Sequence, residues 1–183
     1  MQKNIWLVVV VVLLLLMGIF YVLNNNQKKL VEDKTSQLNI ATNKFEKLLA
    51  YENNYLGNAS NTSNLFNNLP LSNDKTGIAI DSDKLTLIVN YDIPSNSEEE
   101  KAVIYNTTAA FVLIKNLEEI EMRFSSRSYL VKRDNVEKWF GHDYTKLINP
   151  ETFMELVQKP LLQKNSDDWL EQYTNEGDEK SDK

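Results

Sequence analysis

The feature that most constrains this chain is a stretch of nineteen residues, Ile5 to Leu23, that carries no charged or strongly polar side chain. A helix of that length measures about 28 Å, close to the ~30 Å hydrocarbon core of a bilayer. Trp6 and Tyr21 near its two ends suit the membrane interfaces. Because a globular helix normally keeps a polar stripe, and this stretch has none, it predicts a transmembrane helix in contact with the lipid bilayer.

The stretch is predicted to remain as an anchor rather than to be removed as a signal peptide. A signal peptide has a shorter apolar centre that is followed by a small-residue cleavage site. Here the apolar run is long, no such site follows it, and the chain contains no cysteine that could carry a lipid. We therefore expect an uncleaved signal-anchor.

The charges on either side of the anchor leave its orientation open. Lys3 precedes the apolar stretch, whereas Lys28, Lys29 and Lys34 follow it, so the positive-inside rule does not decide. A short tail, here residues 1–4, more often stays inside while a large domain crosses. We expect a single-pass protein of the cell membrane with its N-terminus inside and its C-terminal domain outside.

Composition excludes several functions. The net charge is −6, from 20 basic and 26 acidic residues, and no basic patch stands out, so we expect no nucleic-acid partner. Without cysteine the chain has no disulfide or thiolate metal site, and one histidine, His142, cannot form an H-E-x-x-H motif. Paired carboxylates fit helix caps or solvated faces better than acid–base pairs. We expect no catalytic residues, no metal ligands and no cofactor, and hence not an enzyme.

Residues 24–50 are predicted to form a helical stalk or linker. Val31, Leu38 and Phe45 recur every seven residues, and Leu48 occupies an interleaved position, although Lys34 interrupts the pattern. A sustained coiled coil needs three or four heptads. Two alternatives stay open: weak self-association or binding of a protein partner through the helix at 28–50, or packing of its apolar stripe on the chain's own domain.

The Asn-rich segment that follows contains the one candidate surface. Gly57 and Asn58 tolerate positive φ and predict a tight turn, after which Ser60 or Asn61 would cap a short helix. Such a helix start presents backbone N–H groups that can receive an anion, unless the cap already satisfies them. We take Tyr55, Gly57, Asn58 and Ser60 as a candidate ligand or partner surface.

Alternating and helical periodicities predict an α+β domain over residues 51–173, with a small antiparallel sheet of about four strands packed by helices. Residues 174–183 are predicted to be a disordered tail. The expected strands are 77–81, 84–93, 117–124 and 128–132; the expected helices are 98–116, 135–140, 150–159 ending before Pro160, and a last one carrying Trp169 and Tyr173.

Four stretches together resemble one bacterial family: YLGNASNTSNLFNNLPL at 55–71, LTLIVNYDI at 85–93, YNTTAAFVLIKNLEEIEMRF at 105–124 and SYLVKRDNVEKWFG at 128–141. In order and spacing they are similar to Domain of Unknown Function 4825, over about residues 49–144. The resemblance implies a Gram-positive bacterium and an exported or membrane-tethered protein, related to domains attached to membrane metallopeptidases. It brings no established activity, and implies an extracytoplasmic accessory or sensing role.

The sequence therefore predicts a membrane-anchored protein with an extracytoplasmic, non-catalytic binding or sensory domain. One alternative is a structural subunit of a membrane complex that works through the helix at 28–50. The other is a hydrolase of envelope material that uses carboxylates.

Overall fold

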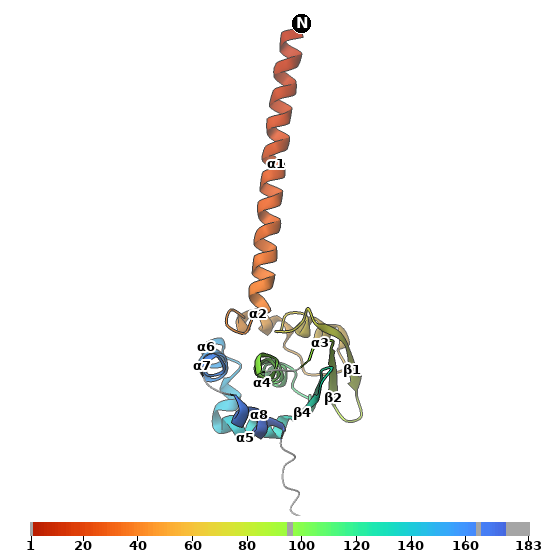
Figure 1. Ribbon diagram of the computed structural model, residues 1–183, viewed down its shortest axis with the longest axis vertical. Coiled ribbons are helices and arrows are strands. Elements are labelled where there is room, and N and C mark those ends of the chain that lie inside the picture. The colour runs from red at the N-terminus through yellow and green to blue at the C-terminus, as the bar shows by residue number, and fades with distance from the viewer. Residues whose placement is uncertain (1, 95–96, 164–165, 175–183) are drawn as a thin grey trace, which may run out of the picture. The chain divides into compact units, whose positions relative to one another are not determined.

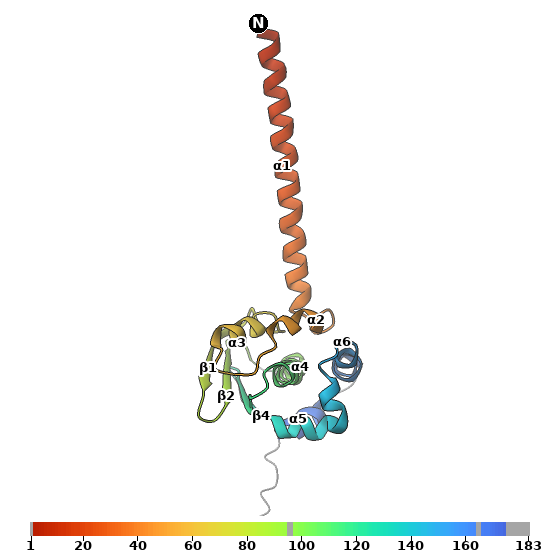
Figure 2. The ribbon, with the colours of Figure 1, turned by 180° about the vertical axis from the view of Figure 1, so that it is seen from behind.

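The chain forms two compact units, residues 1–36 and residues 37–183. The computed structural model describes residues 2–94, 97–163 and 166–174; for residues 2–8, 11, 33–37 and 97 it describes the backbone alone. Beyond Thr174, the predicted disordered tail lies outside the described residues. Figures 1 and 2 show the elements from opposite sides.

The first unit is formed by one helix, α1 (Gln2–Gln37), which already begins at Gln2. The helix predicted over residues 24–50 is continuous only as far as Gln37, and helical structure resumes at Phe45. The carbonyl of Asn39 accepts from the N–H groups of Thr42 at 3.1 Å and Asn43 at 2.7 Å, and its side chain accepts from the Ala41 N–H at 2.8 Å. Local side-chain bonds of this kind compete with helix formation and close the chain into a turn.

The segment after this turn belongs to the core of the second unit. It forms α2 (Phe45–Leu48) and the 3-10 turn η1 (Leu49–Tyr51), and leads to α3 (Ala59–Phe66). Phe45 stacks on Phe153 with 3.9 Å between ring centroids, and Leu48 is fully buried. The alternative of packing on the chain's own domain is thus confirmed for Phe45 and Leu48, and the predicted heptad seam is not one face of one helix.

Four strands form one sheet in the order β1-β2-β3-β4: β1 (Lys75–Asp81), β2 (Thr86–Tyr91), β3 (Glu119–Arg123) and β4 (Ser128–Lys132). The two sequential pairs are antiparallel hairpins, as predicted. The central pair is parallel, with Leu87 opposite Ile120 and Val89 opposite Met122, so the prediction of an antiparallel sheet is wrong there and the sheet is mixed. Helix α4 (Ser97–Leu113) connects β2 to β3, and such a crossover returns the chain to the end where β2 began.

Helix α4 is the centre of the core, as predicted. Every residue from Ala102 to Ile114 is buried, and the sheet turns Leu87, Ile120 and Met122 inward, all fully buried. On the opposite face Leu130 is exposed. In both ribbon views α4 lies between the sheet and the C-terminal helices (Figures 1 and 2), in agreement with the edge-to-face contact of Tyr105 with Phe153.

A buried polar network around Asn43 joins distant parts of the chain. The Tyr105 hydroxyl donates to Asn43 Oδ1 at 2.8 Å, and Gln158 Nε2 donates to the carbonyls of Ile40 at 2.5 Å and Asn43 at 3.0 Å. Asn43 Nδ2 donates to the Asn68 carbonyl at 3.2 Å. Burial raises the pKa of Tyr105, which keeps its hydroxyl a donor. The network holds the segment that follows α1 against α4 and the C-terminal helices.

The C-terminal part is helical: α5 (Arg133–Phe140), η2 (Gly141–Lys146), α6 (Pro150–Phe153), the π-helical turn η3 (Met154–Gln158), α7 (Lys159–Gln163) and α8 (Asp167–Thr174). The predicted Asn149 cap with Pro150 after it is confirmed, as is Gly141, which ends α5 at φ +55°. The predicted end before Pro160 is wrong, because the helix continues to Gln163. Proline clashes with the carbonyl four residues earlier, and the wide turn η3 contains that residue, Leu156.

Arg133 closes the C-terminal end of α4. Its guanidinium donates to the carbonyls of Phe111 at 3.1 Å, Ile114 at 2.8 Å and Leu117 at 2.7 Å, and to the Tyr144 hydroxyl at 2.6 Å. A cation at this position satisfies orphan carbonyls and complements the helix dipole. Only 12% of the side chain is exposed.

Replacing Arg133 with methionine is expected to lower the free energy of unfolding by about 2–4 kcal/mol, because three buried carbonyls lose a charged donor. Lys138, exposed on the same helix, is the matched control, and Lys138→Met is expected to change stability by less than about 0.5 kcal/mol. Urea denaturation of the purified chain, followed by tryptophan fluorescence, measures both. Equal changes in the free energy of unfolding for the two variants would show that Arg133 does not stabilise the C-terminal end of α4.

Candidate functional site

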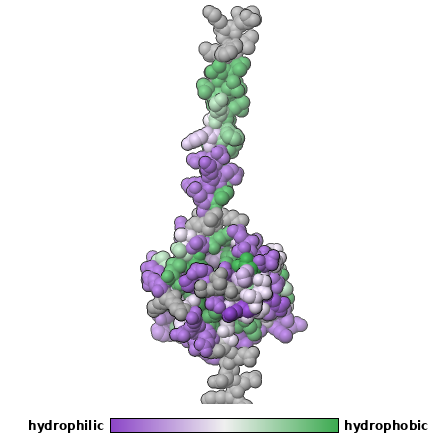
Figure 3. All heavy atoms as spheres, viewed as in Figure 1, coloured by the Kyte–Doolittle hydropathy of each residue, from purple (hydrophilic) through white to green (hydrophobic). Residues whose placement is uncertain are grey.

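Between Val9 and Leu23, the described surface of α1 is apolar on all sides. Every residue from Val9 to Leu23 whose side chain is described is exposed, from 40% at Val10 to 73% at Tyr21 among the large apolar ones. Figure 3 shows this band in green, followed by a hydrophilic band in purple. Over the side chains that the structure describes, which in α1 start at Val9 and omit Val11, no helix combines the length and the apolar character that crossing a membrane requires.

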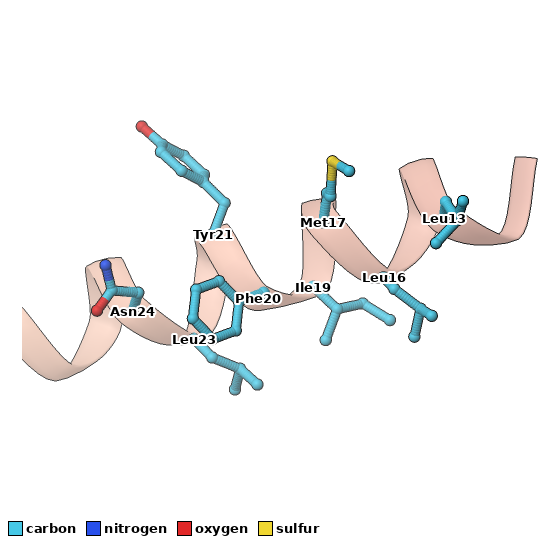
Figure 4. A pocket seen from close by; sticks show the side chains of 8 residues that line it. All are labelled: Leu13, Leu16, Met17, Ile19, Phe20, Tyr21, Leu23 and Asn24. Atoms are coloured by element: carbon cyan, nitrogen blue, oxygen red, sulfur yellow. The ribbon is translucent and has the colours of Figure 1, made fainter. Parts of the chain in front are cut away.

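A shallow hollow on α1 is lined by Leu13, Leu16, Met17, Ile19, Phe20, Tyr21, Leu23 and Asn24 (Figure 4). All eight residues belong to the same helix, so the hollow is a feature of one helical surface rather than a cleft between elements. Its polar groups are the Tyr21 hydroxyl and the Asn24 amide, both at the C-terminal end. Such a surface accepts an acyl chain or an apolar partner, and offers no set of groups for a polar ligand.

The structure places all four residues of the candidate surface on the outside. Tyr55 is 69% exposed, and Gly57, Asn58 and Ser60 are exposed beside it. The cap of α3 is Asn58, whose Oδ1 accepts from the Asn61 N–H at 3.2 Å, so the predicted cap at Ser60 or Asn61 is wrong. The turn ends earlier than expected, and asparagine is among the best N-cap residues.

The start of α3 already has acceptors for most of its donors. The N–H of Ala59 donates to the Gly57 carbonyl at 2.9 Å, and that of Thr62 to the Asn58 carbonyl at 3.0 Å. Together with the Asn58 cap, these bonds engage the N–H groups of Ala59, Asn61 and Thr62, which an anion would otherwise use. The alternative of a helix start that satisfies its own donors is therefore the better description, and the anion site is not supported by the geometry.

Hydrogen bonds join the residues on both sides of Tyr55 to the segment at the C-terminal end of α4. Asn53 exchanges backbone hydrogen bonds with Leu113 at 2.8 Å and Lys115 at 2.9 Å, and the Leu56 N–H donates to Asn116 Oδ1 at 2.6 Å. Tyr55 is thus an exposed aromatic residue in a loop that hydrogen bonds hold in place. Exposed tyrosines of this kind serve as anchors in protein interfaces.

Removing the true cap tests this description of the loop. We expect Asn58→Ala to lower the free energy of unfolding by about 1 kcal/mol, because the Asn61 N–H loses its acceptor. Ser60→Ala is the control and is expected to be neutral within about 0.5 kcal/mol, since Ser60 is exposed on α3. Chemical denaturation of both variants measures the difference, and the opposite ranking would restore Ser60 as the cap.

Several of the exposed titratable residues form surface pairs. His142 is highly exposed, with Nε2 3.2 Å from Asp143, and the ammonium of Lys146, 2.6 Å away, lowers the pKa of Asp143. Glu100 accepts from the Tyr129 hydroxyl at 2.9 Å and from Arg127 at 3.3 Å. In the part of the chain that the structure describes, no group of three or more His, Cys, Asp or Glu residues is arranged to hold a metal ion.

Sequence reasoning missed an aromatic cluster on α5 and α8. Trp139 stacks on Trp169 with 5.1 Å between ring centroids, and both contact Tyr173 edge to face. Trp139 remains 41% exposed, which gives the folded unit a second exposed aromatic residue besides Tyr55. The helical spacing of Trp169 and Tyr173 indicates that these two rings lie on one face of a helix. No local pattern in the sequence indicates that Trp139 packs against them.

The chain consists of a helix with an exposed apolar surface and an α+β domain. In this domain a mixed four-stranded sheet packs against helices. Residues 48–134 match the family described as Domain of unknown function (DUF4825), just under half of the chain, and this confirms the resemblance. The match contains the whole sheet together with α3 and α4. No curated protein and no solved structure matches the chain.

Proposed function

We propose that this chain is a single-pass membrane protein, anchored by the apolar part of α1, whose α+β domain is a non-catalytic binding or sensory module outside the cytoplasm. The observation that carries the proposal is the exposed apolar surface of α1, which has no polar stripe. In the sequence this apolar character begins at Ile5, before the first side chain that the structure describes.

The energetics favour a bilayer as the cover for this surface. Burying one large apolar side chain contributes about 1.5–3 kcal/mol, and α1 exposes more than ten of them between Val9 and Leu23. A water-exposed apolar surface of that extent is not retained by soluble monomers. The backbone of a helix bonds within itself, as a segment in hydrocarbon must.

The location of the domain is supported by the resemblance to the family of Domain of Unknown Function 4825. The binding role is supported by the two exposed aromatic residues, Tyr55 and Trp139, on well-packed parts of the domain. A structural subunit of a membrane complex would use the same surfaces, and its partner would be a protein.

Single-cysteine labelling tests the anchor and its orientation, because the chain has no cysteine of its own. Ser82→Cys places one thiol in the exposed turn between β1 and β2, and Gln2→Cys places one at the N-terminus. With a membrane-impermeant maleimide on intact cells, we expect the thiol at position 82 to be labelled at once and the thiol at position 2 only after permeabilisation.

The same cells, fractionated after an alkaline carbonate wash, report on the anchor separately. We expect the chain in the pellet. Its release into the supernatant would overturn the anchor, whereas labelling of position 82 only after permeabilisation would overturn the extracytoplasmic location and leave the anchor intact.

A further inference from the structure

The charges near the apolar stretch are segregated by sign. The chain as a whole is acidic, with 26 Asp and Glu residues against 20 Lys and Arg, yet the first acidic residue is Glu32. The charged side chains before it are Lys3, Lys28 and Lys29. The basic residues therefore lie next to the apolar stretch, and the acidic residues begin farther along α1.

Lys28 and Lys29 lie on α1 at the depth where lipid headgroups would be. They follow Leu23 by five and six residues, which corresponds to about 8–9 Å along a helix. The headgroup layer on each side of a bilayer is about 5–8 Å thick. Because a lysine stem can extend along apolar surface while its ammonium stays among polar groups, both ammonium groups reach this layer.

Both ammonium groups are available. Lys28 and Lys29 are exposed, and neither makes an ion pair with any residue whose side chain the structure describes. Between them and the apolar stretch lie Asn24, Asn25, Asn26 and Gln27, whose amides are also exposed. Figure 3 shows the change from the apolar band to this hydrophilic band on α1.

We propose that Lys28 and Lys29 form a binding site for the phosphate groups of anionic lipids, so that the anchor selects anionic over zwitterionic lipid around it. The inference rests on the proposed membrane anchor. Lysine donates three hydrogen bonds from a compact charge and binds phosphate as a point charge. The order of charges supports a lipid surface, because the nearest charges are positive and the repelled acidic ones, Glu32 and Asp33, are farther away.

Spin-labelled lipids measure this preference directly. The full chain is reconstituted in phosphatidylcholine vesicles that contain a trace of spin-labelled phosphatidylglycerol or spin-labelled phosphatidylcholine, and the motionally restricted fraction of each label is compared. A basic residue near the surface favours an anionic lipid by up to about fivefold. We expect a clear preference for phosphatidylglycerol that is lost in the variant with Lys28→Gln and Lys29→Gln, and that weakens as salt is raised.

Lys84→Gln with Lys138→Gln removes the same charge from exposed positions of the domain and is the matched control. It is expected to keep the preference; an equal loss in this control would overturn the assignment to Lys28 and Lys29. Equal restriction of both lipids by the unmodified chain would overturn the inference while leaving the anchor in place. Absence of any restricted lipid would overturn the anchor itself.

Discussion

Replacing both Leu14 and Leu15 with lysine is expected to move the chain from the membrane pellet to the soluble fraction. Position 14 is the midpoint of the apolar stretch Ile5–Leu23. A lysine at the centre of a membrane helix costs about 2.5–3.5 kcal/mol on an insertion scale, so two of them cost about 5–7 kcal/mol. Loss of two leucines adds to this cost. Carbonate extraction and immunoblotting of the pellet and supernatant give the distribution.

The same helix supplies a closely matched control. Leu30 and Val31 are exposed to 64% and 63%, against 63% and 62% for Leu14 and Leu15, but they lie beyond the polar residues that follow Leu23. Leu30→Lys with Val31→Lys is expected to leave the chain in the pellet. If both double variants remain in the membrane pellet, or if both are lost from it, the membrane contact does not come specifically from the apolar part of α1.

Phe153→Ala is expected to destabilise the α+β domain by about 3–5 kcal/mol, the usual cost of removing a buried phenylalanine. The ring is fully buried and stacks on Phe45 at an interplanar angle of 6°. It also forms an edge-to-face pair with Tyr105, with 5.3 Å between ring centroids. The cavity would open where α2, α4 and α6 meet. Urea denaturation with fluorescence detection measures the shift in the transition midpoint.

Met154 is the control for this effect, because it follows Phe153 directly in the chain but is 38% exposed. Met154→Ala is expected to cost less than about 1 kcal/mol, since little apolar surface is lost from the interior. A similar midpoint for the two variants would mean that the Phe45–Phe153 contact contributes little to folding.

Local patterns predicted the elements of the domain well and their assembly less well. The alternation in residues 86–91 and 119–123 reflects one buried and one solvated face, and it is visible in sequence. That β2 and β3 pair in parallel depends on α4 crossing between them, which no local pattern records. Pro160 was expected to end a helix, since proline disrupts a regular α-helix. No sequence pattern predicted the wide π-helical turn η3 that accommodates this proline.

For the candidate surface around Tyr55, too, local sequence patterns predicted only part of the structure. The turn at Gly57 was predicted from the tolerance of Gly57 and Asn58 for positive φ, although neither residue adopts it. The cap depended on which asparagine the turn would bring to the helix start. No local pattern singled out Arg133, because its four acceptors are brought together only by the approach of α5 to the end of α4. The pairing of Trp139 with Trp169 likewise joins helices that are distant in the chain.

The network around Asn43 has a consequence for how this domain could be transferred between proteins in evolution. The family match covers residues 48–134, but Gln158 holds Ile40 and Asn43, and Phe45 packs on Phe153, all outside that range. A gene fusion that copied the matched region alone would leave the Tyr105 hydroxyl without its acceptor and open the core on both flanks. The folded unit of this chain therefore extends beyond the matched region at both ends.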